Sequence, residues 1–186
     1  MKSFMHPVPT LLAGLALSAS ACALELHSPD LQEGQPLSKN QEFSGFGCSG
    51  PNLSPALNWK DAPAGTRSFA ITAYDPDAPT GSGWWHWLVF NLPATTDHLP
   101  ADAGKRQALP AGSVQSLTDY GTPGFGGACP PPGDAPHRYI FTVHALKVPR
   151  LELDAQAMPA LVGYHLKANS LGTATLTATY ARPPAP

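Results

Sequence analysis

Residues 83–93, with the sequence GWWHWLVFNLP, form the segment that most restricts how this chain can fold. Apolar side chains fill both the odd and the even positions, and Pro93 ends the run. A strand that is apolar on both faces is typical of the centre of a sheet covered on each side. The segment therefore predicts a layered β protein, with His86 as a titratable ring inside an otherwise apolar strand.

Three further segments show the alternation of half-buried strands, namely residues 67–74, 137–148 and 173–180. One helix is expected at about 158–169, because Pro159 suits a first helical turn. The 17 glycines and 22 prolines among 186 residues favour long, shaped loops over further helices. Together these features predict a mainly β domain with one or two helices near its C-terminus.

The remaining segments are expected to be loops. Residues 24–43 are polar and irregular, residues 45–59 are rich in glycine, proline and serine, and residues 93–136 form the longest irregular part. Long loops inside a compact domain tend to carry function.

The first 23 residues have the pattern of a secretory signal peptide. Lys2 supplies a weak positive charge, and residues 10–17 form an apolar run too short to span a bilayer. Residues 21–23, Ala-Cys-Ala, match a cleavage site.

We therefore expect cleavage after Ala23, one domain over residues 24–186, and a periplasmic or secreted location. Lipidation of Cys22 is the alternative, although Ala19 stands where a lipoprotein signal prefers leucine. No later apolar run is long enough to cross a membrane.

Loss of the signal peptide leaves two cysteines, Cys48 and Cys129, in an oxidising compartment. Both lie in glycine-rich loops far apart in the sequence, so one disulfide is expected. In the chain-entropy model, closing so long a loop contributes about 4 kcal/mol to stability. Two free, buried thiols are the alternative.

Several function classes lack their sequence signals. The net charge is −2 and no lysine or arginine cluster occurs, so nucleic-acid binding is not expected. Motifs of nucleotide-binding loops, of a serine nucleophile elbow and of metal sites are missing too. We expect neither cofactor nor metal, and no enzyme, with a slow hydrolase built on a His–Asp pair as the alternative. For the oligomeric state, a homodimer is an alternative to a monomer.

Polar residues stand at the ends of the expected strands. Asp75 and Asp77 follow the first strand, and His137 and Tyr139 share one face of a later strand. If these strands neighbour that of His86, then an acid, two imidazoles and a phenol meet in one pocket. Such groups suit an anionic ligand.

Alternation also places His86 on the same strand face as Trp84, Leu88 and Phe90. Backbone amides could approach a bound oxyanion closely at three glycines, Gly126, Gly127 and Gly133.

Structural roles compete with these interpretations. A solitary strand histidine often belongs to the core, and Asp-Pro-Asp often serves only to turn the chain. We assign structural roles to the four remaining histidines, His27, His98, His144 and His165.

Residues 74–93, YDPDAPTGSGWWHWLVFNLP, and residues 130–146, PPPGDAPHRYIFTVHAL, resemble the signatures of the phosphatidylethanolamine-binding protein family, also called the Raf kinase inhibitor family. Residues 52–59 and 160–169 fit as well, so the resemblance covers the chain after the signal peptide. It is nearest to the exported, kinase-inhibitor-like bacterial branch.

The resemblance implies a large antiparallel sheet, a smaller second sheet and a few peripheral helices. It also implies a pocket for phosphate-like groups, including phospholipid headgroups. Carried over by motif, the pocket residues are Asp75, Pro79, His86, Pro131, His137 and Tyr139, with Gly127 at a loop position lining the same pocket.

In this interpretation His86 and His137 donate to the anion, Asp75 fixes an imidazole tautomer, and Tyr139 adds a hydroxyl. Cys129 stands where eukaryotic relatives commonly have glycine, so a disulfide there would stiffen the pocket rim. We expect an exported binding protein for a small phosphoryl or carboxylate ligand. The alternative is a secreted regulator or inhibitor of a protein partner, such as a hydrolase or a host factor.

Overall fold

The computed structural model describes residues 23–105 and 108–184. The expected signal peptide, apart from Ala23, lies outside the described residues, as does Cys22. No helix in these two ranges is both long and apolar enough to cross a membrane.

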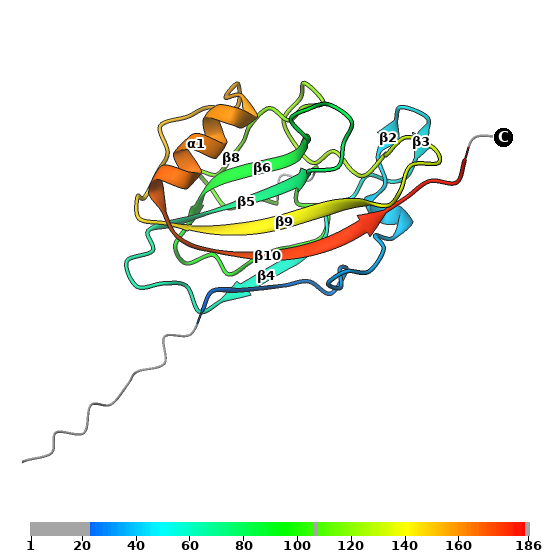
Figure 1. The fold of residues 1–186 in the computed structure, drawn as a ribbon. Helices are drawn as coiled ribbons and strands as arrows, with labels where there is room; N and C mark the ends of the chain where they lie inside the picture. The colour runs from blue at the N-terminus through cyan, green and yellow to red at the C-terminus, as the bar shows by residue number, and fades with distance from the viewer. Residues whose placement is uncertain (1–22, 106–107, 185–186) are drawn as a thin grey trace, which may run out of the picture.

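A five-stranded antiparallel sheet forms the centre of the molecule (Figure 1). Its strands, in spatial order, are β10 (Ser170–Tyr180), β9 (His137–Leu146), β5 (Ser68–Asp75), β6 (Trp84–Pro93) and β8 (Val114–Gln115). The expectation of a mainly β fold with a large antiparallel sheet is confirmed. The sheet brings β5, β6 and β9 together as neighbours, so the polar residues at their ends share one edge.

A smaller three-stranded sheet covers one face of the large sheet. It consists of β1 (Glu25–His27), β4 (Leu57–Lys60) and β7 (His98–Leu99), and a separate hairpin pairs β2 (Ser44–Gly45) with β3 (Cys48–Ser49). These short strands lie in segments that the sequence analysis expected to be loops. Two to four residues are too few to show a strand period, which explains the difference.

The opposite face of the large sheet is covered by α1 (Pro159–Asn169), close to its expected position (Figure 1). Pro159 occupies the first helical turn. Backbone N–H groups there have no acceptor within the helix, so proline loses no hydrogen bond at this position. Val162 and Leu166 point inward and pack with Leu88 and Phe90 of β6. One further turn of 3-10 helix, η1, spans Lys39–Gln41.

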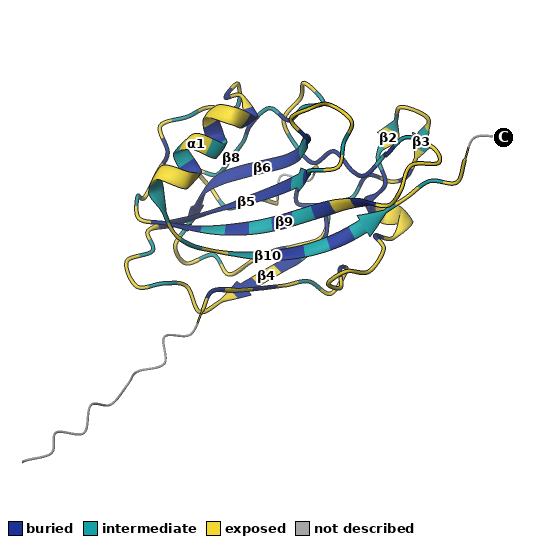
Figure 2. Cartoon of the chain, viewed as in Figure 1, coloured by how far each residue is buried: buried dark blue, intermediate teal, exposed yellow. Residues whose placement is uncertain are grey.

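Apolar clusters on both sides of β6 confirm that it is a central strand (Figure 2). Trp87 and Val89 belong to the larger cluster between the two sheets, whereas Leu88 and Phe90 belong to the cluster beneath α1. All four side chains are essentially inaccessible to solvent. The layered arrangement predicted from residues 83–93 therefore holds.

A β-bulge interrupts the pairing of β5 with β6 at His86. Ala73 lies opposite Trp87 and Tyr74 lies opposite Trp85, which leaves His86 as the extra residue. A bulge of this kind changes which face of the sheet the following side chains occupy.

The bulge corrects one sequence expectation. His86 does not share a face with Leu88 and Phe90, because those two residues face α1. His86 lies with Trp84 at a cavity on the other side of the strand.

Candidate ligand pocket

A cavity of about 180 Å³ opens at the edge of the large sheet where β5 ends and β6 and β9 begin. Its lining includes six of the seven expected pocket residues, namely Asp75, Pro79, His86, Pro131, His137 and Tyr139. Residues far apart in the sequence thus meet here because β5 runs antiparallel to both of its neighbours.

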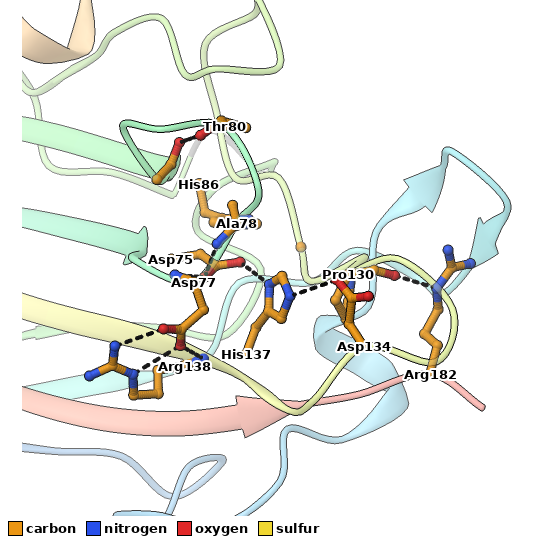
Figure 3. Close-up of polar contacts among 12 residues, drawn as sticks. Asp75, Asp77, Ala78, Thr80, His86, Pro130, Asp134, His137, Arg138 and Arg182 are labelled. Atoms are coloured by element: carbon orange, nitrogen blue, oxygen red, sulfur yellow. Dashed lines mark hydrogen bonds and ion pairs between the residues drawn. The ribbon is translucent and has the colours of Figure 1, made fainter. Parts of the chain in front are cut away.

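Asp75 and His137 form a buried pair on the cavity wall (Figure 3). Nδ1 of His137 lies 2.8 Å from Oδ2 of Asp75, and each side chain is about 5% exposed or less. The other carboxylate oxygen of Asp75 accepts from the backbone N–H groups of Asp77 and Ala78, at 2.8 and 3.1 Å. Asp75 therefore fixes the tautomer of His137, and Nε2 of that ring lies 3.4 Å from Oδ2 of Asp134.

Asp77 has a structural role outside the cavity lining. Its carboxylate accepts two hydrogen bonds from the Arg138 guanidinium, at 2.7 and 2.9 Å, and one from the Arg138 backbone N–H at 2.8 Å. Hydrogen bonding from Arg138 lowers the pKa of Asp77 to about 2. Asp77 thus ties the loop after β5 to the start of strand β9 (Figure 3).

His86 is held differently from His137. Its Nδ1 lies 2.7 Å from the carbonyl oxygen of Gly126, and a carbonyl only accepts, so Nδ1 carries the proton and donates. Its Nε2 is buried and has no hydrogen-bond partner among the residues that the structure describes. Burial lowers the pKa of His86 more than the nearby carbonyls and Asp75 raise it, so the ring is neutral near pH 7. Nε2 of His86 is consequently an acceptor.

Two tyrosine rings enclose His86. Tyr139 and Tyr120 both meet the imidazole edge-on, with ring centroids 5.1 and 5.6 Å away. Burial raises the pKa of both phenols, so their hydroxyls stay protonated. The Tyr120 hydroxyl donates to the carbonyl of Gly127 at 2.8 Å.

The amides of the three glycines expected to approach an oxyanion all donate to groups within the protein. The amide of Gly126 donates to His86, that of Gly127 to the side chain of Asn52, and that of Gly133 to Arg182. Gly127 is not among the residues that line the cavity, and a Cβ atom there would collide with the backbone oxygen of Gln41. Its lack of a side chain serves close packing.

The disulfide expected between Cys48 and Cys129 is confirmed, with an S–S distance of 2.07 Å. It joins the β2–β3 hairpin to the cavity rim, since Cys129 itself lines the cavity. The hairpin carries Phe46 to the mouth, where its ring is 71% exposed and stacks on Tyr120 with centroids 5.8 Å apart.

Six lining residues were missed by the sequence analysis, namely Phe46, Ala78, Thr80, Trp84, Tyr120 and Pro130. Two features of the sequence indicated segments that hold lining residues, without identifying the residues themselves. Tyr120 lies in the long loop expected to carry function, and Phe46 stands two positions from Cys48.

The cavity lining carries few charged side chains. Among the residues that the structure describes, the lining contains one carboxylate, from Asp75, and neither lysine nor arginine. Within the same described ranges, no group of three or more His, Cys, Asp or Glu side chains could hold a metal ion.

Residues 27–181 match the family model described as phosphatidylethanolamine-binding protein. The chain belongs to this family. Among its relatives is the UPF0098 protein YbcL of Escherichia coli, which is 53% identical over 175 residues, covering 93% of this chain and 96% of that protein. The UPF0098 protein YbhB of the same organism is 51% identical over 158 residues, or 84% and 99% of the two chains.

Solved structures of the family agree with the fold. The crystal structure of YbcL superimposes with a TM-score of 0.84 at 52% identity, over 86% of this chain and 99% of that one. A phosphatidylethanolamine-binding protein homologue from Chlamydia trachomatis gives a TM-score of 0.72 at 29% identity, over 86% and 98% of the two chains. None of these three relatives carries the name of an enzyme.

Proposed function

We propose that this member of the phosphatidylethanolamine-binding protein family is a binding protein whose cavity holds a small ligand with a phosphoryl or carboxylate group. The observation that carries the proposal is Nε2 of His86, a buried atom of a cavity-lining residue that has no hydrogen-bond partner in the described part of the chain. A buried polar atom left unpaired costs about 1–3 kcal/mol, so a ligand that bonds to it gains that free energy.

The other lining residues give the ligand a defined place. Asp75 holds the His137 ring in one orientation, and the protonated hydroxyl of Tyr139 can donate to a ligand oxygen. Pro79 and Pro131 form walls with little conformational freedom. A cavity of about 180 Å³ is smaller than the pockets that enclose drug-sized molecules, so it suits a headgroup.

Calorimetric titration with inorganic phosphate tests the proposal. We expect the wild-type protein to bind phosphate, and His86→Ala and His137→Ala each to bind it at least about tenfold more weakly. His98→Ala is the matched control, because His98 is an exposed histidine outside the cavity. Unchanged affinity in both cavity variants contradicts the proposal.

We also propose that the protein acts in the periplasm or outside the cell. The Cys48–Cys129 disulfide supports this, because such bonds persist in oxidising compartments. We expect the exported protein to have the mass of residues 24–186 with one disulfide and no lipid on Cys22. Recovery of the uncleaved chain from the cytosol alone would contradict export.

A protein partner is the second candidate. Met158, at the N-cap of α1, and Leu161 and Tyr164 within the helix follow one another at three-residue spacing and are 62%, 45% and 70% exposed. This apolar stripe favours a regulator that contacts another protein through α1. Binding of a protein partner that persists in His86→Ala but is lost in the double variant Leu161→Ser with Tyr164→Ser would support this role. The reverse pattern would exclude it.

A slow hydrolase is the third candidate, because the Asp75–His137 pair resembles a general base with its orienting carboxylate. Turnover of a phosphoester panel that disappears in His137→Ala would support it. Equal turnover in that variant would assign the activity to a contaminant.

A further inference from the structure

We infer that the Asp134 carboxylate takes the place on His137 that an oxygen of an anionic ligand would take, so that Asp134 limits how tightly the cavity binds anions. This role of Asp134 rests on the proposed anion binding. It adds to the site a residue that is not among those lining the cavity and that lowers affinity instead of raising it.

The contact between Asp134 and His137 is long and partly open to solvent. Oδ2 of Asp134 lies 3.4 Å from Nε2 of His137, beyond the range of about 2.7–3.2 Å that is usual for an N–H···O bond (Figure 3). The side chain of His137 is 5% exposed, whereas that of Asp134 is 42% exposed. Nε2 of His137 therefore faces a partly exposed side chain, and rotation of that side chain would uncover the nitrogen.

The backbone that carries Asp134 is fixed, so its side chain can move without the loop. Pro131 and Pro132 restrict the preceding segment, and the Asp134 amide donates to the Pro131 carbonyl at 3.4 Å. Gly133 has a positive φ of 85°, which suits glycine in a tight turn. Its amide donates to the carbonyl of Arg182 at 3.1 Å, which ties the turn to the C-terminal segment.

Asp134 and an anionic ligand need the same hydrogen. Nδ1 of His137 already faces the buried carboxylate of Asp75 at 2.8 Å, which leaves Nε2 as the second nitrogen of the ring. A carboxylate oxygen only accepts hydrogen bonds, and so does an unprotonated phosphoryl oxygen. Because a hydrogen bond weakens steeply when the N–H points away from its acceptor, one N–H serves only one of them well.

A ligand has little to overcome when it displaces Asp134. Among the residues that the structure describes, the Asp134 carboxylate bonds only to His137. The neighbouring Arg138 is not an alternative partner, because its guanidinium donates to Asp77 at 2.7 and 2.9 Å. Water can hydrate the exposed carboxylate once it has turned away, and ion pairs of this kind contribute little free energy. A ligand oxygen at an ordinary distance from Nε2 would therefore replace the longer contact.

Asp134→Ala tests the competition. Calorimetry with inorganic phosphate at pH 7 should give about two- to fivefold tighter binding than in the wild-type protein. Asp134→Asn removes the charge but keeps an oxygen that can accept from Nε2, so its gain in affinity should be smaller. Asp97→Asn is the matched control for the loss of one negative charge, because Asp97 is fully exposed and does not line the cavity. It should bind phosphate as the wild-type protein does.

The double variant Asp134→Ala with His137→Ala shows whether Asp134 acts through His137. Without the imidazole there is no N–H to compete for, so the double variant and His137→Ala should bind phosphate equally well. A general repulsion between Asp134 and the anion predicts instead the same gain with and without His137. That result would overturn the inference.

A crystal structure of the wild-type protein with phosphate gives a second readout. We expect a phosphate oxygen about 2.7–3.2 Å from Nε2 of His137, with the Asp134 carboxylate turned toward solvent. A phosphate ion bound in the cavity while Asp134 keeps its contact with His137 would contradict the competition.

The outcomes separate this inference from the proposed function. If phosphate binding weakens in His137→Ala but Asp134→Ala binds no more tightly than the wild-type protein, the inference is overturned and anion binding stands. If neither the wild-type protein nor Asp134→Ala binds phosphate at millimolar concentration, both are overturned. Binding that is measurable only in Asp134→Ala would support both.

Discussion

The two cavity histidines differ because of what each Nδ1 meets. In His137 this nitrogen meets the buried carboxylate of Asp75, and in His86 it meets the carbonyl of Gly126. The carboxylate of Asp75 is a buried side chain, so the orientation of the first ring depends on a side-chain contact, whereas the second ring is held by the backbone. A substitution can therefore remove the partner of His137 but not that of His86.

Asp75→Asn should reveal how much the buried carboxylate contributes. Its two oxygens accept from His137 and from the amides of Asp77 and Ala78, and an asparagine offers only one oxygen. We expect the free energy of unfolding in urea to fall by about 1–3 kcal/mol, and phosphate binding to weaken. Asp97→Asn, at a fully exposed carboxylate, should change stability by less than about 0.5 kcal/mol. Equal stability of the two variants would contradict this account.

His144 should make stability depend on pH. Burial lowers its pKa from 6.5 to about 4, so between these values the unfolded chain binds a proton that the folded protein does not. The contribution of a neutral His144 is complete above pH 6.5 and is lost as the pH falls toward 4. Between pH 6.5 and pH 4, we expect the free energy of unfolding of His144→Gln to fall by about 2 kcal/mol less than that of the wild-type protein. Urea denaturation at pH 7 and pH 4 measures the difference, and parallel losses would contradict the prediction.

At the scale of elements, the sequence predicted the strands and the helix that have a marked hydrophobic pattern. The long strands β5, β6, β9 and β10 and the helix α1 all appear close to their expected bounds. The bulge at His86 could not be predicted, because alternation assumes regular pairing with a neighbour that the sequence does not identify. The short strands β1, β4 and β7 are stabilised by contacts with the large sheet, and local sequence carries no sign of those contacts.

The β2–β3 hairpin contains one feature of the pocket that the sequence predicted and one that it did not. The sequence paired Cys48 with Cys129 and placed the bond at the rim, but it did not reveal Phe46 at the mouth. Phe46 adopts a positive φ of 54°, which few residues other than glycine adopt readily, so local preference argued against its place in a tight turn. The hairpin's attachment through the disulfide and the ring contact with Tyr120 keep it there.

Replacement of both cysteines tests this element. The double variant Cys48→Ser with Cys129→Ser should lower the free energy of unfolding by about 2–4 kcal/mol, because the closed loop is long. It should also weaken phosphate binding, since Phe46 is no longer held at the mouth. Phe46→Ala separates the two effects, because the ring is 71% exposed and its loss should weaken binding while stability changes little. Normal binding by both variants would show that the hairpin does not shape the site.

At the scale of the whole molecule, the cavity adjoins the apolar layer between the two sheets through Tyr139. Tyr139 lines the cavity and belongs to the same apolar cluster as Phe141 and Val143, its neighbours on that face of β9. The cluster beneath α1 lies on the other side of the large sheet and contributes no residue to the cavity lining. Packing defects in the two layers should therefore differ in their effect on binding.

Phe141→Ala and Leu166→Ala compare the layers directly. Both side chains are almost completely buried, so each truncation should lower the free energy of unfolding by about 2–5 kcal/mol. Only Phe141→Ala should also weaken phosphate binding, because it leaves Tyr139 beside an empty volume and loosens the wall against which His86 rests. Urea denaturation and calorimetry on the same preparations measure the two effects. Equal loss of affinity in Leu166→Ala would show that the cavity responds to global stability rather than to the layer from which it is built.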